Sequence, residues 1–394
     1  MNDTAAARAQ HPESKESIQT SNPPGLELKG HLPALDGVRG LAILMVLATH
    51  YLVAGTAPTL YGRIITKLSD YGAMGVDLFF VLSGFLITGI LLDTRKKHAY
   101  FRNFYMRRAL RIFPLYYGVL FVGLVLVPIF WNSPDLDTAV HNQAWLWGYS
   151  VNIFVSIHGK FDVLPFFNHF WSLAVEEHFY LVWPLVVYFN DSSRLKKIAV
   201  LVSIGALLLR LGMIMCGVNE TAIYTLTPAR MDALAMGGLL AAVAREKGGV
   251  ERLRKLSLRV LVIACVFIVA SFFFTLVFPR AQPYFHEIRG TAFTAVFCAL
   301  LIEALIGPRI VQRFFKSGAM RFFGKYSYGL YVFHFIYGYL LLRHRTVDIV
   351  SRWVGSQTAA IFLQAIAATA VAVLISLLSY HLYEKHFLKL KKFF

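Results

Sequence analysis

Arg39 and His50 are the first pair of residues whose types and spacing suggest chemistry. They lie eleven residues apart in a stretch predicted to be helical. Eleven steps of about 100° place both on nearly the same helix face, roughly 16 Å apart along the axis. Imidazole titrates near neutral pH, so a shielded histidine can act as a general base towards a hydroxyl group. The alternative is a structural histidine that is bonded to a neighbouring helix.

Glu176 and Glu177 are adjacent carboxylates within a predicted membrane segment. Charged groups inside a bilayer are costly, so each needs a partner or a water-filled cavity. Because neighbouring positions point about 100° apart on a helix, the two carboxylates cannot share one face. They are candidates to orient or charge-stabilise the histidine, as a carboxylate does in hydrolytic triads. The alternative for either glutamate is a structural role, in which it contacts an Arg or Tyr on another helix.

Arg108 and Arg111 are three residues apart in a basic stretch and share one helix face. Two guanidinium groups in this arrangement suit phosphate groups. Anchoring of the chain by positive charge on the cytoplasmic side would place arginines here as well.

Five more polar residues lie in or beside apolar segments. Arg230 is placed to meet an external substrate, whereas Asp232, in a first helical turn, also suits the helix dipole. His334 lies about two turns inside its segment and is a candidate for either a structural or a catalytic role. Asp77 and Ser83 bring polarity to the second apolar segment and are candidates for substrate binding.

The composition indicates that these residues belong to an integral membrane protein. Hydrophobic residues make up 57% of the 394 positions and charged residues 15%, with a mean hydropathy of +0.57. A soluble domain would carry nearer a quarter charged residues. The net charge of +17 is carried by basic residues beside apolar blocks, which favours membrane topology and anionic lipid over nucleic acid. We therefore predict an all-α bundle of about ten transmembrane helices at residues 40–56, 72–92, 112–131, 168–189, 197–216, 228–244, 258–278, 288–306, 327–342 and 358–381.

The distribution of Lys and Arg predicts the topology of this bundle. With the N-terminus inside, the predicted inner segments hold 29 of these residues and the outer segments hold 8. This bias predicts that both termini are cytoplasmic. Residues 144–157 are apolar but number only 14, so we predict a re-entrant or interfacial element there. Were this segment to cross the membrane, every later loop would change sides and the bias would be lost.

The ends of the chain and its cysteines complete the outline. Residues 1–32 lack an apolar core and are predicted to form a disordered cytoplasmic tail without a signal peptide, followed by a transmembrane domain at 33–390. The three cysteines, Cys216, Cys265 and Cys298, favour neither a disulfide framework nor a thiolate metal site. No histidine pair has metalloprotease-like spacing, so no metal is expected.

Taken together, the sequence resembles the acyltransferase-3 family of integral membrane O-acyltransferases. Seven strings carry this resemblance, in order and over about residues 33–387. They are DGVRGLAILMVLATH (36–50), GVDLFFVLSGFLIT (75–88), RRALRIFPLYY (107–117), FWSLAVEEHFYLVWPL (170–185), RMDALAMGGLL (230–240), YSYGLYVFH (326–334) and YHLYEKHF (380–387).

The resemblance implies a ten-helix enzyme of a bacterial inner membrane. Cytoplasmic acyl-CoA, with acetyl-CoA as the expected form, would be the donor substrate. No cofactor is implied, and the acceptor would be a hydroxyl of an extracytoplasmic glycan or similar molecule. The family's arginine–histidine motif maps onto Arg39 and His50, which makes His50 the expected general base. Its remaining motifs map onto Arg108 with Arg111, Glu176 with Glu177, and Arg230 with Asp232. The sequence departs from the family pattern at His178, His386 and Phe335–Ile336.

Two other classes of function account for part of the pattern. A transporter that moves an acyl donor or a glycan unit without chemistry would also have charges inside the membrane, although two related halves are expected of it and none is visible. A peptide-binding or assembly scaffold would leave the shared face of Arg39 and His50 unexplained.

Overall fold

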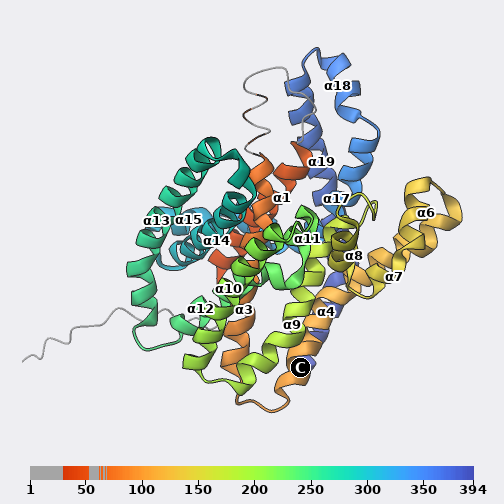
Figure 1. Cartoon of the computed structure of the whole chain (residues 1–394). Helices are drawn as coiled ribbons and strands as arrows, with labels where there is room; N and C mark the ends of the chain where they lie inside the picture. Colours follow the sequence, from red (N-terminus) through yellow and green to blue (C-terminus); the bar gives the residue numbers. More distant parts are fainter. Residues whose placement is uncertain (1–29, 53–61, 63, 65–66, 68) are drawn as a thin grey trace, which may run out of the picture.

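The computed structural model describes residues 30–52, 62, 64, 67 and 69–394, and the described residues form helices and turns without a strand (Figure 1). Most of the predicted tail, residues 1–29, lies outside the described residues. The all-α prediction is confirmed. The long helices are α1 (Pro33–Tyr51), α3 (Gly75–Thr94), α4 (Tyr100–Phe121), α9 (Trp171–Phe189), α10 (Ser192–Met215), α12 (Thr227–Ala244), α13 (Gly249–Val277), α14 (Gln282–Ile306), α17 (Ser327–Arg343) and α19 (Gln357–Ser379).

Each of these ten helices overlaps one predicted span, but fewer qualify as membrane spans by length and composition. In the described part of the chain six stretches do so, and α1, α9, α12 and α17 are not among them. Helix α17, for example, has only 17 residues. The count of about ten spans is therefore not confirmed by these criteria. The six stretches are Tyr71–Thr94, Tyr100–Phe130, Ser192–Met215, Gly249–Val277, Pro279–Ile306 and Gln357–Phe393.

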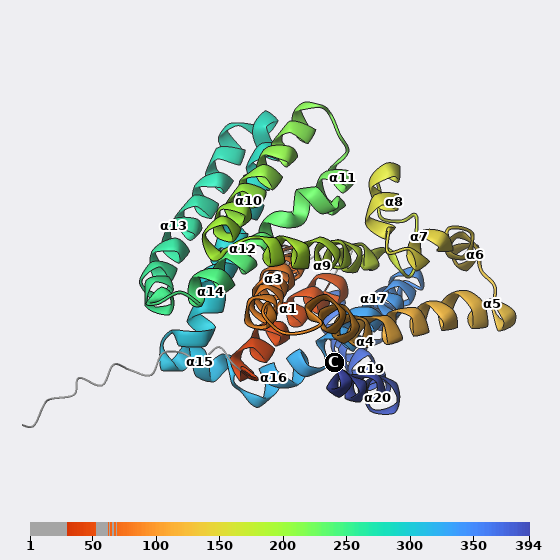
Figure 2. The same ribbon diagram turned by 90° about the horizontal axis from the view of Figure 1, so that it is seen from below.

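The helices surround a central group that consists of α1, α3 and α9. Seen from below, α10, α13 and α14 lie on one side of this group and α4, α17 and α19 lie on the other (Figure 2). Large apolar side chains such as Ile263, Val269 and Leu276 stand exposed along α13. An exposed apolar helix surface of this length suits contact with lipid rather than water.

Helices α3 and α12 approach each other closely through two glycines. A Cβ on Gly84 would lie 1.9 Å from the Leu234 carbonyl oxygen, and a Cβ on Gly237 would lie 2.0 Å from that of Val81. Only glycine fits at such contacts, which is why small residues mark tight helix pairs in membranes.

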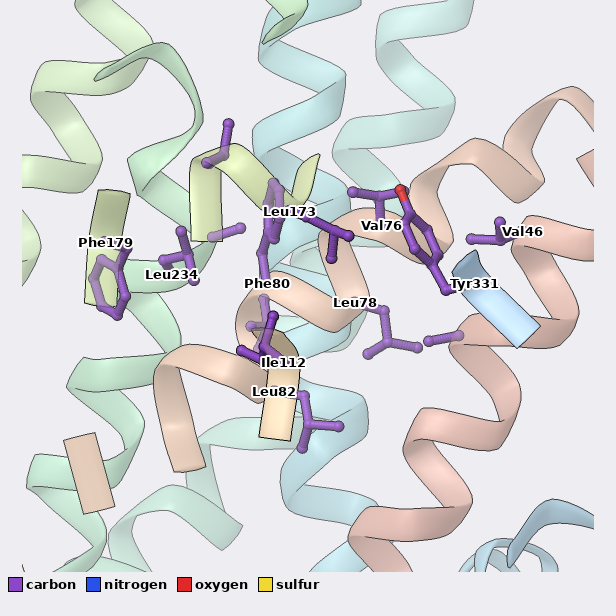
Figure 3. Close-up of a cluster of buried hydrophobic side chains, with 14 of the residues drawn as sticks. Val46, Val76, Leu78, Phe80, Leu82, Ile112, Leu173, Phe179, Leu234 and Tyr331 are labelled. Atoms are coloured by element: carbon purple, nitrogen blue, oxygen red, sulfur yellow. The ribbon is translucent and has the colours of Figure 1, made fainter. Parts of the chain in front are cut away.

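The apolar core fills the space between the central helices (Figure 3). Phe80 of α3, Leu173 of α9 and Leu234 of α12 are buried in one continuous cluster, and Tyr331 of α17 joins them. The packing of this cluster fixes the rotation of each helix about its axis, and thereby the direction in which the polar residues on the same helices point.

The ambiguous segment 144–157 does not cross the bundle as one helix. It is divided between α7 (Gln143–Trp147) and α8 (Val151–His158), which lie with α6 (Pro134–His141) to one side of the bundle (Figure 1). Eight residues of helix rise only about 12 Å, too little to span a bilayer. The prediction of a non-spanning element is confirmed.

Figure 1 shows the turn between α3 and α4 and the C-terminus at the same end of the molecule. The basic stretches 93–111 and 385–392 meet there, and we call it the basic end. The shorter elements are η1 (Tyr71–Met74), η2 (Val122–Leu126), α5 (Val127–Phe130), η3 (Asn168–Phe170), α11 (Glu220–Thr225), η4 (Pro279–Ala281), α15 (Arg309–Phe315), α16 (Gly318–Lys325), α18 (Thr346–Val354), η5 (Tyr380–Glu384), α20 (Lys385–Lys389) and η6 (Leu390–Phe393).

Candidate active site

A partly open cavity lies between α1, α3, α4, α9 and α17. It encloses about 770 Å³ of empty space, including its open part. Its apolar wall comes mainly from α3, and its polar side chains come from all five helices. The polar lining residues are Arg39, Ser83, Arg108, Arg111, Ser172, Glu176, Tyr180, Ser327, Tyr328 and Tyr331.

Three of these lining residues are the arginines singled out in the sequence. Arg39, Arg108 and Arg111 come from two helices and line the same cavity. Only Arg39 has an ion-pair partner among the described residues, since its Nη1 donates to Asp36 at 2.9 Å. Lys391 of η6 adds a fourth cation within electrostatic range of all three. Lys391 is not predicted from the sequence as a site residue, because basic residues near the C-terminus indicate membrane topology equally well.

Glu176 lies in this cavity beside the arginines. The hydroxyls of Ser83 and Tyr180 hydrogen-bond each other, and both lie beside the Glu176 carboxylate. The Arg108 guanidinium lies over the Tyr180 ring, 5.1 Å from the ring centroid. The predicted site residues Ser83, Arg108 and Glu176 are thus brought together, and Tyr180 is an additional member that sequence reasoning did not select.

Glu177 does not line the cavity, although Arg108 lies within its electrostatic range. Its neighbours are the hydroxyls of Tyr116 and Tyr149, and its Oε1 is buried without a hydrogen-bond partner in the described structure. No hydrogen bond or ion pair among the described residues joins either glutamate to His50. The expected assistance of His50 by a glutamate stays a prediction.

His50 lies in a cluster of three histidines, not in the wall of the cavity. Its Nδ1 hydrogen-bonds the Val46 carbonyl at 2.9 Å. The His334 ring centroid is 4.9 Å from that of His50, and the His169 centroid is 5.3 Å from that of His334. The structure thereby joins the predicted residues His50 and His334. His169 is not among the site residues predicted from the sequence. Its position at the edge of a predicted span, where a polar ring needs a partner, could have indicated a role in the site.

The other two histidines are more deeply buried than His50. His334 is 0% exposed and its Nδ1 lies 2.6 Å from the Tyr331 carbonyl oxygen. His169 is 4% exposed and its Nε2 lies 3.1 Å from the Val332 carbonyl oxygen. Each ring therefore donates one N–H to a backbone carbonyl, which leaves the other nitrogen as an acceptor in the neutral tautomer.

Tyr331 stands between the cavity and the histidine cluster. Its hydroxyl bonds Ser172 Oγ at 2.5 Å and the His169 carbonyl at 3.0 Å. Both Tyr331 and Ser172 line the cavity, whereas none of the three histidines does. Along α17 the lining residues Ser327, Tyr328 and Tyr331 lead directly to His334 on the next turn. One layer of hydrogen-bonded side chains thus separates the two polar regions.

Arg230 and Asp232 belong to a third polar region. Arg230 forms a buried ion pair with Asp77, and its guanidinium lies 4.8 Å from the Tyr224 ring centroid. Asp232 pairs with Arg210 at 2.7 Å, and Arg210 also contacts Glu287 at 3.0 Å. Arg230 is 7% exposed, which places it inside the bundle. Binding of the acceptor by Asp77, Arg230 and Asp232 stays a prediction.

The motifs of the cavity and of the histidine cluster fall within one matched domain. A family model described as an acyltransferase domain matches residues 32–381. The chain belongs to this acyltransferase family. The matched range contains Arg39, His50, Arg108, Glu176 and His334, so the polar regions described above are parts of the family domain.

Two curated relatives have names that state an activity. The chain is 29% identical over 322 residues to the peptidoglycan O-acetyltransferase OatA of Listeria monocytogenes, covering 77% of this chain and 49% of the relative. It is 28% identical over 325 residues to the O-acetyltransferase OatA of Staphylococcus aureus, covering 77% and 50%. The chain thus spans about half the length of these relatives. No solved structure matches it.

Proposed function

We propose that this protein is a membrane O-acyltransferase that moves an acyl group from cytoplasmic acyl-CoA to a hydroxyl of an extracytoplasmic glycan. Acetyl is the proposed acyl group. The observation that carries the proposal is the arrangement of an arginine-lined cavity one side-chain layer away from a histidine cluster. Peptidoglycan is the first acceptor to test, because it is named for the relative from Listeria monocytogenes.

The cavity suits the donor. Arg39, Arg108 and Arg111 line one cavity, and Lys391 lies within electrostatic range of all three. The carboxylates of Asp36, Glu176, Glu177 and Glu384 lie near these arginines. Like charges held together in this way are stabilised by a polyanion such as the phosphates of coenzyme A. In the proposed complex the phosphates contact these cations and the thioester arm extends along α17 towards Tyr331.

His50 is the proposed general base. Because its Nδ1 donates to Val46, its Nε2 has a free lone pair that can take the proton of the acceptor hydroxyl. The hydroxyl oxygen attacks the thioester carbonyl, a C–O bond forms, and the C–S bond breaks. The departing thiolate takes the proton back from the imidazolium, which restores the neutral histidine. Glu176 is proposed to hold Ser83, Tyr180 and Arg108 in place for the donor.

The proposed orientation follows from charge. The basic end faces the cytoplasm, both termini lie on that side, and all ten long helices cross or line the bilayer of a bacterial plasma membrane. Along α1, roughly 16 Å separate Arg39 from His50. The donor thus binds from the cytoplasmic side, and the acceptor reaches the histidine cluster from the other side.

The experiment that tests this function uses purified protein in liposomes with radiolabelled acetyl-CoA and peptidoglycan glycan strands as acceptor. Wild-type protein is expected to label the glycan, and His50→Ala is expected to abolish labelling. His158→Ala serves as a matched control, because His158 Nδ1 likewise bonds a carbonyl four residues earlier but lies in α8, apart from the cluster.

The outcomes separate the proposal from its rivals. Label moved across the membrane without a covalent product would contradict the enzyme proposal and favour a transporter. Full glycan labelling by correctly inserted His50→Ala would reject His50 as the base while keeping the acyltransferase.

A further inference from the structure

Two ring nitrogens of the histidine cluster are hydrogen-bond acceptors that no donor group of the described residues contacts. His169 Nδ1 and His334 Nε2 are both buried with no hydrogen-bond partner in the described part of the chain. His50 Nε2 also has no hydrogen-bond partner among the described residues, although the His50 side chain is only partly buried. Buried polar atoms are nearly always satisfied in folded proteins, so two unsatisfied nitrogens in one cluster indicate a place that a ligand completes.

The protonation of the three rings follows from their partners. Each ring bonds a backbone carbonyl, and a carbonyl can only accept, so that ring nitrogen carries the proton. A second proton would create a buried cation, which no carboxylate among the described residues contacts. The three remaining nitrogens are therefore lone-pair acceptors, and a matching ligand must bring N–H or O–H groups.

A metal ion is not what these nitrogens fit. Among the described residues no group of three or more His, Cys, Asp or Glu side chains is arranged to hold one. Phe335 also lies against the cluster, stacked on His169 with a centroid distance of 4.9 Å and in edge contact with His50 at 5.3 Å. An apolar ring in that place favours an organic ligand that carries hydrogen-bond donors on an apolar frame.

We propose that His169 Nδ1 and His334 Nε2 bind the acyl acceptor by accepting hydrogen bonds from donor groups next to the hydroxyl that reacts at His50. This inference rests on the proposed function and narrows its substrate class. One hydrogen satisfies one nitrogen, so the acceptor carries at least two further donor hydrogens, on hydroxyl or amide groups near the acylated position. A sugar meets this requirement, whereas an alcohol with a single hydroxyl does not. His169 is thus a positioning residue, and His50 remains the base.

Two substitutions at His169 separate its two nitrogens. His169→Gln places an amide near the position of Nε2, so the bond to Val332 is retained and the acceptor at Nδ1 is lost. His169→Asn places an amide oxygen near the position of Nδ1 and loses the bond to Val332. His158→Gln makes the same substitution outside the cluster, where it removes the Nδ1 bond to Phe154, and serves as the control for folding and insertion.

The test measures acetyl transfer to two acceptors. The peptidoglycan disaccharide of N-acetylglucosamine and N-acetylmuramic acid offers several donors, and cyclohexylmethanol offers one hydroxyl. His169→Gln is expected to raise KM for the disaccharide about tenfold, as the loss of one buried hydrogen bond implies. KM for acetyl-CoA and transfer to cyclohexylmethanol are expected to change less than about twofold, because neither uses this bond. His169→Asn is expected to retain more disaccharide affinity than His169→Gln.

Two other outcomes would overturn either this inference alone or the proposed function as well. The inference is rejected if His169→Gln leaves KM for the disaccharide unchanged, or if it lowers transfer to both acceptors equally. The proposed function would then still be supported by the loss of activity in His50→Ala. Absence of transfer by wild type to either acceptor rejects the proposed function and this inference with it.

Discussion

The backbone carbonyl of Tyr331 accepts a hydrogen bond from His334 Nδ1 at 2.6 Å, while the Tyr331 side chain lines the arginine-lined cavity. One residue thereby contacts both polar regions of the proposed enzyme. The Tyr331 hydroxyl also holds Ser172 and the carbonyl of His169. In the proposed mechanism the acyl group passes this layer between the arginines and His50, so its size is expected to affect the rate of transfer.

Tyr331→Ala is expected to change the preference for acyl length. Removal of the ring widens the passage, so the rate with hexanoyl-CoA relative to acetyl-CoA should rise about tenfold, a normal effect of pocket size on selectivity. Competition between the two donors measures this ratio. Ser172→Ala removes the hydroxyl partner without widening the passage and should leave the ratio near that of wild type. The same shift in both variants would contradict a role for the ring.

Lys391→Ala is expected to weaken donor binding. Lys391 lies close to the cavity arginines, and the loss of a charge-assisted contact to a phosphate should raise Kd for coenzyme A about tenfold. Calorimetry in detergent at low and high salt measures this change, which should shrink as salt screens the charges. The exposed neighbour Lys392 provides the control variant Lys392→Ala. Equal effects of both substitutions would show that only the general charge of the C-terminus matters.

Gly237→Ala is expected to destabilise the contact between α3 and α12. The added methyl would lie 2.0 Å from the Val81 carbonyl oxygen, so the helices must separate, which costs about 1–3 kcal/mol or more. Gly205→Ala is the control, since nothing lies within 4 Å of the corresponding methyl. It should leave stability unchanged or raise it by about 0.5–1 kcal/mol through helix propensity. Unfolding in detergent compares the two, and equal Tm values would contradict the close packing.

Asp77→Asn is expected to destabilise the protein by about 3–5 kcal/mol, because it leaves the Arg230 guanidinium as a buried unpaired charge. Addition of Arg230→Gln should recover part of the loss, since the double variant has no buried charge at this pair. Asp162→Asn, at the exposed Lys160 pair, should have almost no effect. A double variant less stable than Asp77→Asn would point to separate roles for the two residues.

Family membership and the all-helical fold were predictable because their signals are local in the chain. Apolar runs interrupted by basic loops indicate membrane helices wherever they occur. The non-spanning nature of residues 144–157 followed from length and charge alone, and α7 and α8 confirm it. Arg108 and Arg111 share a helix face by their spacing, and both indeed line one cavity.

Only the tertiary structure could decide which distant residues meet. His50 and His334 are almost three hundred residues apart, and their contact depends on how α1 and α17 pack around the core. The same holds for His169, for the pairing of Asp232 with Arg210, and for the approach of Lys391 to the arginines. Periodicity fixes the face of a helix on which a residue lies, but the rotation of each helix against its neighbours is set by the packing of all side chains at once.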